Sequence, residues 1–524
     1  MGKDLLAFQG ELLVAGGGVV QARSAYLGKN AGNAVLATVQ GSGAVLQVEA
    51  LLSVGQGGEA TLSVLAGGTV VATQLALGAG GVLNLQGGTV QVVSATNAGT
   101  TDNFNWYAGT LRYLGDTSTG DGQLLGRSTT LAPGNHLVVD GQLTVGQNHA
   151  LTLLGGSAAL GSLRVLGAVS VDAFSALDVG DDGLDNQGAL QLAGGTLRGT
   201  GNLVNRAVLG GHGLITGEQG FINNGLLEAS GGRLELATLG QNSNNGSWDM
   251  LSGRGLLLSG NDLVNRGAMT LNGDTVSGTA NLINDASGTL SGRGVISAGF
   301  VNAGRLVVDA GALRIDRESF ENTGRIVLGS ATATLSGGEL YNRGFIQGQG
   351  QVTNRISNTG TVSALGAGTT LTLGQVDNLN RGGNEVGTLV AGSGATLLLT
   401  GGFDGQNLGT IRLAGGTFDS NGTAFINGST GVVSGFGTLN AGAVHNQGRI
   451  LLSGGVSELH ADLVNAAAAN GVAAGQIILS GNSNTTFYGT VDVQGGAELR
   501  VSTGSVATFF GLVQQRTGAR FTGA

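Results

Sequence analysis

The sequence predicts an all-β protein, a single-stranded parallel β-helix (β-solenoid) with about 20 residues per coil. Three observations predict it: an asparagine recurs at that spacing, apolar residues flank it with strand parity, and the composition combines abundant glycine with almost no proline. The asparagine stands in a frame that reads Leu-x-Asn-x-Gly-x-Leu, as in residues 263–269. The recurring residues are Asn186, Asn205, Asn223, Asn244, Asn265, Asn284, Asn302, Asn322, Asn342, Asn358, Asn378, Asn407, Asn427, Asn446 and Asn465.

Strand parity places each of these asparagines on the apolar face. Two residues before the asparagine, thirteen of the fifteen positions hold Leu, Ile, Val or Phe, and four residues after it eleven hold a large apolar residue. Side chains alternate between the two faces of a strand, so residues two apart share a face. The intervening positions often hold arginine. We therefore expect the asparagines to point inward and the arginines outward.

An inward asparagine is costly when its amide has no partner. In stacked coils about 4.8 Å apart, successive amides can bond to one another along the axis. Ten of the fifteen frames have glycine two residues after the asparagine, where a Cβ would be crowded or φ would be positive. We predict an amide ladder; the alternative is that Asn-x-Gly marks exposed turns.

Composition supports a packed solenoid. The chain has 102 glycines and one proline in 524 residues, yet 41% of its residues are hydrophobic. A disordered glycine-rich chain is normally poor in large aliphatic residues, and proline cannot donate to a sheet ladder. A solenoid can be long without dividing into domains, since each coil contacts only its neighbours. About 26 coils would form a rod on the order of 125 Å long.

Four segments are expected in order along the chain. Residues 1–115 form coils in which Gly-Gly-Thr-Val replaces the asparagine frame, and Leu65–Val70 returns twenty residues later as Leu85–Val90. Residues 116–150 form an irregular loop or transition. Residues 151–480 form the Asn-x-Gly solenoid. Residues 481–524 form phenylalanine-rich coils that would fill the end of the core.

Parts of the sequence resemble a known class of proteins. Residues 52–70, the segment Asn103–Arg112 and the Phe-Phe-Gly at 509–511 resemble bacterial β-strand-repeat surface proteins. These include autotransporter passengers, filamentous-haemagglutinin-like adhesins and extracellular repeat proteins with Pro-Glu-Pro sorting tails. The resemblance implies a right-handed β-helix that is secreted or attached to the cell surface, with an adhesive or matrix role. It rests on a repeat style and carries over no functional residue.

The chain also departs from that class. Its first residues do not form a cleavable signal, no apolar stretch reaches the length of about 18 residues that a membrane span needs, and Pro133 as the single proline rules out a Pro-Glu-Pro tail. We interpret the chain as a fragment of a longer surface protein. A net charge of −9 and a pI near 5.0 speak against nucleic acid as a partner. The expected partners are therefore a surface polysaccharide or other copies of the same chain.

A carbohydrate-active β-helix enzyme, a polysaccharide hydrolase or lyase, is the main alternative. Pectin hydrolases of that fold use acidic pairs and a Gly-His-Gly, and this chain has Gly180-Asp181-Asp182 and Gly211-His212-Gly213. Two carboxylates can serve as acid and base in glycoside hydrolysis. The family's Asn-Thr-Asp and Arg-Ile-Lys elements are absent, however, and both aspartates lie in an ordinary polar turn. We predict no enzyme and no catalytic residue; the third candidate is a subunit that assembles end to end into a filament or lattice.

Metal and cofactor sites are not expected. There is no cysteine, and the five histidines lack ligand spacing. Asp181, Asp182 and Asp185 could hold Ca²⁺, but a solvated turn accounts for them. Trp106, Tyr107 and Tyr113 could form a sugar-stacking platform. Core filling is the favoured reading, because Phe104 and Trp106 share a face.

The outward arginines predict a broken basic stripe along one edge of the solenoid. Each lies one or three residues after a ladder asparagine, and the set is Arg266, Arg305, Arg325, Arg343 and Arg449. Such a stripe would hold anionic polysaccharide through several weak contacts. The alternative is that the arginines pair locally with groups such as Glu321.

Overall fold

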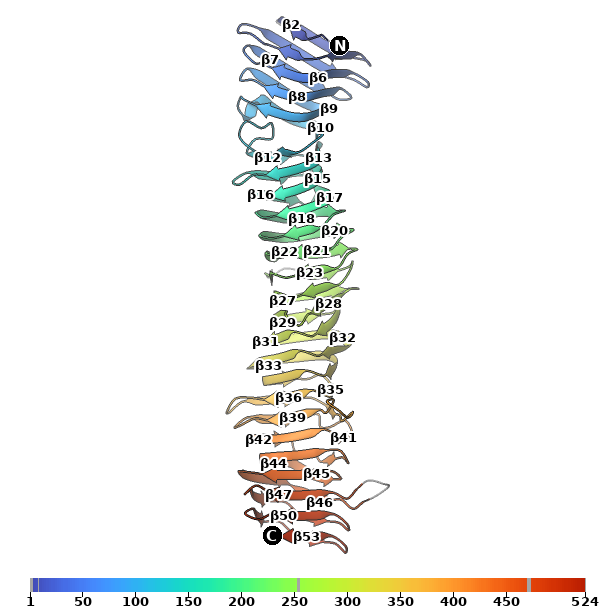
Figure 1. Cartoon of the computed structure of the whole chain (residues 1–524), viewed down its shortest axis with the longest axis vertical. Helices are drawn as coiled ribbons and strands as arrows, with labels where there is room; N and C mark the ends of the chain where they lie inside the picture. Colours follow the sequence, from blue (N-terminus) through green and yellow to red (C-terminus); the bar gives the residue numbers. More distant parts are fainter. Residues whose placement is uncertain (1–2, 8, 252–254, 469–472, 524) are drawn as a thin grey trace. The chain divides into compact units, whose positions relative to one another are not determined.

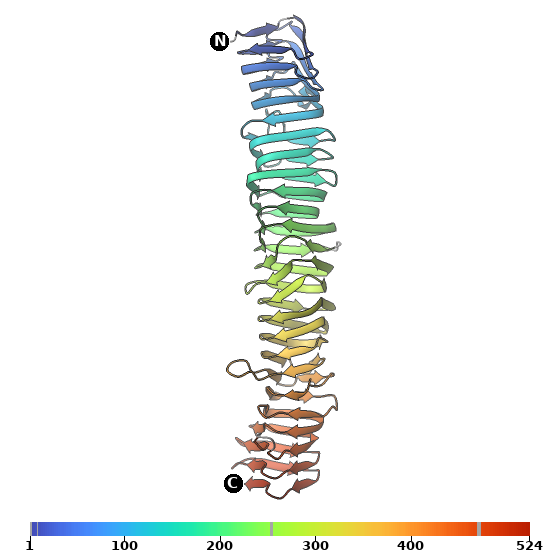
Figure 2. The same ribbon diagram turned by 90° about the vertical axis from the view of Figure 1, so that its right-hand side faces the viewer.

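The computed structural model describes residues 3–7, 9–251, 255–468 and 473–523. It is 67% strand and 1% helix, and its parallel strands wind into a β-solenoid of about 24 turns with roughly 21 residues per turn. The predicted fold class is therefore confirmed. The average turn is slightly longer than the asparagine spacing, because some turns carry inserted loops. The chain forms two compact units, Met1–Leu263 and Val264–Ala524, each of which is a stack of turns (Figures 1 and 2).

One turn of the first unit shows how the sequence frame produces the coil. It consists of the short strand β19 (Leu203–Asn205), the bent strand β20 (Val208–Gly217) and the start of the next turn, β21 (Phe221–Asn223). β19 and β21 pair in parallel with Asn205 opposite Asn223. Apolar side chains that alternate along these strands are fully buried, so the coil interior is the core.

The N-terminal coils have the same construction without the asparagine. β8 (Thr69–Leu77) and β9 (Gly81–Asn97) pair in parallel, with Thr69 opposite Thr89 and Val70 opposite Val90. The twenty-residue return of Gly-Gly-Thr-Val is thus one turn of the solenoid. Inward valines and leucines fill the core at these positions.

The regular stacking is interrupted between β10 (Phe104–Tyr113) and β12 (Ser128–Leu131), where a loop leaves the stack (Figure 1). β11 (Thr117–Ser118) and β13 (Asn135–Val145) also lie within the segment predicted to be irregular. The solenoid therefore resumes by residue 135.

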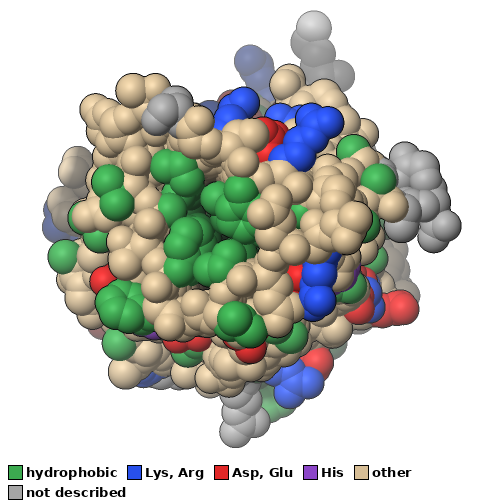
Figure 3. Space-filling model, turned by 90° about the horizontal axis from the view of Figure 1, so that it is seen from below, with side chains coloured by type: hydrophobic (Ala, Val, Ile, Leu, Met, Phe, Trp, Pro, Cys, Tyr) green, Lys and Arg blue, Asp and Glu red, His purple; other side chains and the backbone are tan. Residues whose placement is uncertain are grey.

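In the second unit, the phenylalanine-rich coils pack as a column of rings. Phe487 at the end of β48 (Asn484–Phe487) is buried and stacks on Phe509 of β51 (Val506–Phe509), with ring centroids 4.9 Å apart. In the last described turn, Val513 and Phe521 stand in register with the buried Val491 and Leu499. Both are 36% exposed, and apolar side chains gather on this end face (Figure 3).

Candidate functional site

The predicted asparagine ladder is present in both units. All fifteen asparagines have a relative exposure of 0%. In the first unit, Nδ2 of Asn186 donates to Oδ1 of Asn205, Asn205 donates to Asn223, and Asn223 donates to Asn244, each at 2.7 Å. The inward prediction is confirmed, and the interpretation of Asn-x-Gly as an exposed turn is wrong.

In the second unit, the ladder runs from Asn265 to Asn465. Every Nδ2 donates to the Oδ1 of the next asparagine at 2.7–2.9 Å. The long step from Asn378 to Asn407 does not break it, because Asn380 and Val386 form an antiparallel bridge that closes the extra residues into a hairpin. The ladder ends where Val493 takes the next position and Asn465 donates to the backbone oxygen of Glu498 at 2.9 Å.

The asparagines also fasten the backbone of one turn to the next. Nδ2 of Asn284 donates to the carbonyl oxygen of Arg305 at 3.1 Å, three residues beyond the next asparagine. The carbonyl oxygen of Asn322 accepts hydrogen bonds from two backbone amides of the next turn, those of Arg343 at 2.8 Å and Gly344 at 3.0 Å. With no exposure and no free surface, the ladder is a structural element and not a ligand site.

The outward arginines do not form one stripe. Arg305 and Arg325 are direct neighbours on β31 (Arg305–Val308) and β33 (Arg325–Asn342). Arg343 lies in another column and forms an ion pair with Glu321 at 3.2 Å, as Arg266 does with Asp285 at 3.0 Å.

Arg325 and Arg449 complete the set. The guanidinium of Arg325 lies over the Phe345 ring, 5.3 Å from its centroid, and donates to Gln347. Arg449 stands between Val432 and Gln476 in the register. Carboxylate partners therefore account for Arg266 and Arg343, and the adjacent basic pair within this set is limited to Arg305 and Arg325.

The Asp-Asp and Gly-His-Gly elements do not come together. Asp181 accepts a hydrogen bond from Thr200 at 2.7 Å, beside one corner of the coil. His212 stands in register with Ala193, at the bend of β18 (Ala189–Gly199), which is a different corner. Asp185 is engaged by Arg206 at 2.8 Å. Over the described ranges, no group of three or more potential metal ligands is found.

The aromatic residues near position 106 divide between two environments. Tyr113 is 1% exposed, and burial raises the pKa of its hydroxyl far above the usual value. Tyr107 is 62% exposed on the opposite face. The three residues considered as a sugar-stacking platform are thus not assembled. Phe104 and Trp106 share a face as predicted, but both are only half-buried, because the loop after β10 leaves them uncovered.

A mixed-charge cleft in the second unit was not predicted from the sequence. It has a volume of about 280 Å³ and is lined by Glu321, Tyr341, Arg343, Ser357, Thr359 and Arg381. The inserted hairpin after Asn378 supplies Arg381. The Tyr341 hydroxyl donates to Glu339 at 3.0 Å, which raises the pKa of Tyr341.

Two carboxylates lie close to each other in the same unit, near Tyr341. Asp377 and Asp404 stand on neighbouring turns, since Val376 bridges to Phe403. Burial and then the charge of Asp404 raise the pKa of Asp377. Asp404 itself accepts hydrogen bonds from Arg355 and Gln375. The only sequence signal for this pair was the irregular step in the asparagine spacing.

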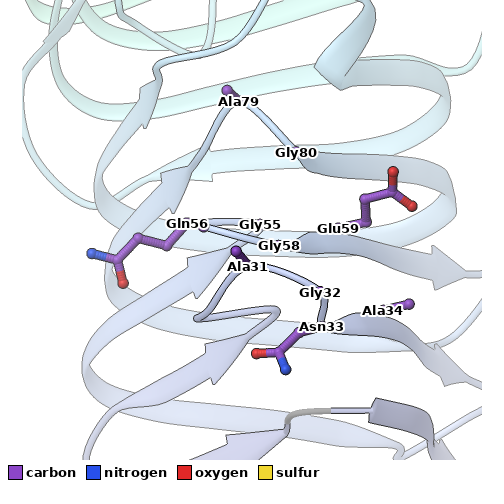
Figure 4. Close-up of a pocket in the computed structure, with 11 residues that line it drawn as sticks. Ala31, Gly32, Asn33, Ala34, Gly55, Gln56, Gly58, Glu59, Ala79 and Gly80 are labelled. Atoms are coloured by element: carbon purple, nitrogen blue, oxygen red, sulfur yellow. The ribbon is translucent and has the colours of Figure 1, made fainter.

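A shallow groove of about 440 Å³ lies at a corner of the first unit (Figure 4). Small residues from three successive turns form its walls, including Gly32, Gly57 and Gly80. The side chains of Gln56 and Glu59 extend in opposite directions (Figure 4). Polar groups therefore do not converge on a common point in this groove.

No protein-family model matches the sequence, and the comparison with curated proteins finds no match. In the part of the chain that the structure describes, no helix has the length and hydropathy needed to cross a membrane.

Proposed function

We propose that this chain is a non-enzymatic structural and adhesive stalk of a bacterial surface protein or secreted protein. The observation that supports the proposal is the buried asparagine ladder. It adds a line of side-chain hydrogen bonds to the backbone ladders that already join successive turns. Such repeated contacts between neighbours let a solenoid be extended without a globular core.

The mechanism of a stalk is geometric. At roughly 21 residues per turn, each unit of about 260 residues contains about twelve turns. With an inter-strand spacing of about 4.8 Å, each unit then spans about 60 Å along its own axis. Peeling a turn from the stack breaks its backbone ladder and its asparagine bond together, and this cooperativity favours a stiff spacer.

Negative-stain electron microscopy of the purified chain tests the stalk directly. We expect thin particles made of segments as wide as a single solenoid coil. Compact particles would contradict a stalk. Long fibres that grow with protein concentration would favour the filament or lattice subunit instead.

The adhesive part of the proposal concerns Arg305 and Arg325. We expect the R305Q/R325Q variant to lose retention on immobilised alginate, because the two charges are adjacent and exposed. Wild-type retention should fall between about 0.01 M and 0.15 M salt, as the Debye length shortens from about 30 Å to about 8 Å. The matched control is R343Q, since Arg343 is already paired with Glu321. Equal retention of wild type and the double variant would leave only the structural role.

The enzyme alternative has a test of its own at Asp377 and Asp404. A hydrolase or lyase would release reducing ends or unsaturated products from a polysaccharide, and D377N and D404N would abolish that release. The stalk proposal predicts no product from alginate, pectin or xylan by wild type or either variant. Product formation that the two substitutions remove would contradict it.

A further inference from the structure

The loop after β10 opens a gap in the first unit. Residues 104–108 of β10 pair with β9 on one side, whereas the pairing of β10 with β13 begins only at Gly109. β12 pairs with β14 (Ala150–Leu153) on its far side. Between β10 and β12 lies a cleft of about 550 Å³, in the size range of small-ligand pockets.

Core-type residues form the aromatic wall of this cleft. Phe104 and Trp106 stand in register with Leu83 and Leu85, which are both 0% exposed. They belong to the inward columns, yet they stay half-buried because no strand covers them. Their ring centroids are 5.7 Å apart and the planes are tilted by 37°. The Trp106 Nε1 donates to the Gly109 oxygen at 3.1 Å, so the indole is fixed in place.

The opposite wall is a loop with its own hydrogen bonds. The amide of Asn97 donates to the Gly122 oxygen at 2.8 Å, and Thr96 bridges to Gln123 in antiparallel fashion. The amide of Gly126 donates to the Gln123 oxygen at 3.0 Å. The cleft is therefore already formed before any ligand binds, which lowers the entropic cost of binding.

The residues that line the cleft carry no net charge. Among the described residues that line the cleft, Asp121 and Arg127 carry charge, and they pair with each other. Gln123 and Thr129 also line it. The Gln123 side chain has no hydrogen bond within the described part of the chain, and the hydroxyl of Thr129, which is in register with the buried Leu151, donates to the Leu125 oxygen. These groups can serve a ligand that offers many hydroxyls and no net charge.

We propose that this cleft binds a segment of a neutral oligosaccharide. The apolar C–H face of a sugar ring packs on an aromatic ring, while its hydroxyls require hydrogen-bond partners when they leave water. Phe104 and Trp106 supply the first, and Gln123 with the hydroxyl oxygen of Thr129 supplies the second. The inference goes beyond the stalk role and does not depend on it.

An inserted peptide strand is the other ligand that a gap between strands suggests. It fits the cleft less well. The uncovered edge of β10 spans only residues 104–108, and the Trp106 oxygen already accepts a bond from Asn135 Nδ2 at 3.2 Å. The cleft therefore offers a peptide only a short row of unpaired backbone groups.

Tryptophan fluorescence gives a direct test, because the chain has two tryptophans, Trp106 and Trp248. Trp248 is 0% exposed, so acrylamide should quench Trp106 selectively. We expect cellohexaose, xylohexaose, maltohexaose or chitohexaose at millimolar concentration to protect Trp106 in the full chain. No protection by any of these four probes would overturn the proposal. If an extended Thr-Val peptide protected Trp106 and the oligosaccharides did not, the cleft would be a binding site for a peptide strand, and the proposal would be overturned as well.

Calorimetry with the best probe then tests the residues. We expect W106A and Q123A each to weaken binding by about tenfold or more, with an unchanged circular dichroism spectrum for Q123A. The matched control is Y107A, which removes an exposed ring from the other face of the same strand and should leave the affinity unchanged. Equal losses in Y107A and Q123A, or binding that salt abolishes, would contradict a neutral-sugar site.

Discussion

Replacing Asn322 with leucine is expected to lower the free energy of unfolding by about 2–6 kcal/mol, since two buried polar groups each lose a partner at about 1–3 kcal/mol. Nδ2 of Asn302 loses the acceptor it reaches at 2.7 Å, and Oδ1 of Asn342 loses its donor. Leucine has as many side-chain heavy atoms as asparagine but a larger volume, so crowding in this fully buried position adds to the loss from the hydrogen bonds.

Hydrogen exchange on the two neighbouring turns is the best measurement, because a chain with two units need not unfold in one step. Exchange should speed up for amides near Asn302 and Asn342 and stay unchanged in the first unit. The control is Thr323→Lys, at an exposed position on the same strand end, which should leave exchange and the melting midpoint nearly unchanged. A stable Asn322→Leu protein with a destabilised Thr323→Lys protein would contradict the inward ladder.

The ladder was predictable because it depends on local parity repeated at a fixed period. The residues two before and four after each asparagine define its face, and coil stacking then brings like residues together. The direction of the ladder was not predictable. In the described ladder bonds Nδ2 donates toward the C-terminal side, as from Asn302 to Asn322. Several of these amides, such as that of Asn284, also donate to the backbone of the next turn, and the sequence pattern does not reveal this second bond.

The arginine stripe shows what parity leaves out. Arg305 and Arg343 both point outward, but one lies three residues after its asparagine and the other one residue after. The chain turns a corner between those positions, so the two residues face different sides of the coil. Strand parity determines whether a side chain points inward or outward. The distance of the residue from the corner determines which side of the solenoid it lies on.

Spacing could have separated Asp181 from His212. They are 31 residues apart, about one and a half periods, so coil geometry places them at different corners. The cleft at Trp106 could not have been found in this way. It depends on which residues of β10 the next strand covers. β13 pairs with β10 only from Gly109 onward, and the local pattern around Trp106 does not show this.

Replacing Gly344, the glycine two residues after Asn342, with alanine is expected to cause the second large loss of stability. A Cβ at Gly344 would lie 2.0 Å from the carbonyl oxygen of Gly324 in the preceding turn. The backbone of Gly344 is not in the positive-φ region, so crowding alone explains the glycine. Its amide shares the Asn322 oxygen with that of Arg343, which holds the two turns close together. We expect a loss of about 3 kcal/mol or more, the upper range for overpacking, because a backbone carbonyl cannot move aside as a side chain can.

The measurement is a denaturant titration of Gly344→Ala beside Gly115→Ala. Gly115 also lacks a positive φ, and a Cβ there would meet nothing within 4 Å. Both substitutions remove the same flexibility from the unfolded chain, which by itself stabilises by about 0.4–1 kcal/mol. Gly115→Ala should therefore be neutral or slightly stabilising, while Gly344→Ala should shift the midpoint of the second unit strongly downward. If neither variant shifted its midpoint from that of wild type, adjacent turns could move apart at this corner without loss of stability. Close stacking of the turns would then not be the reason for glycine at position 344.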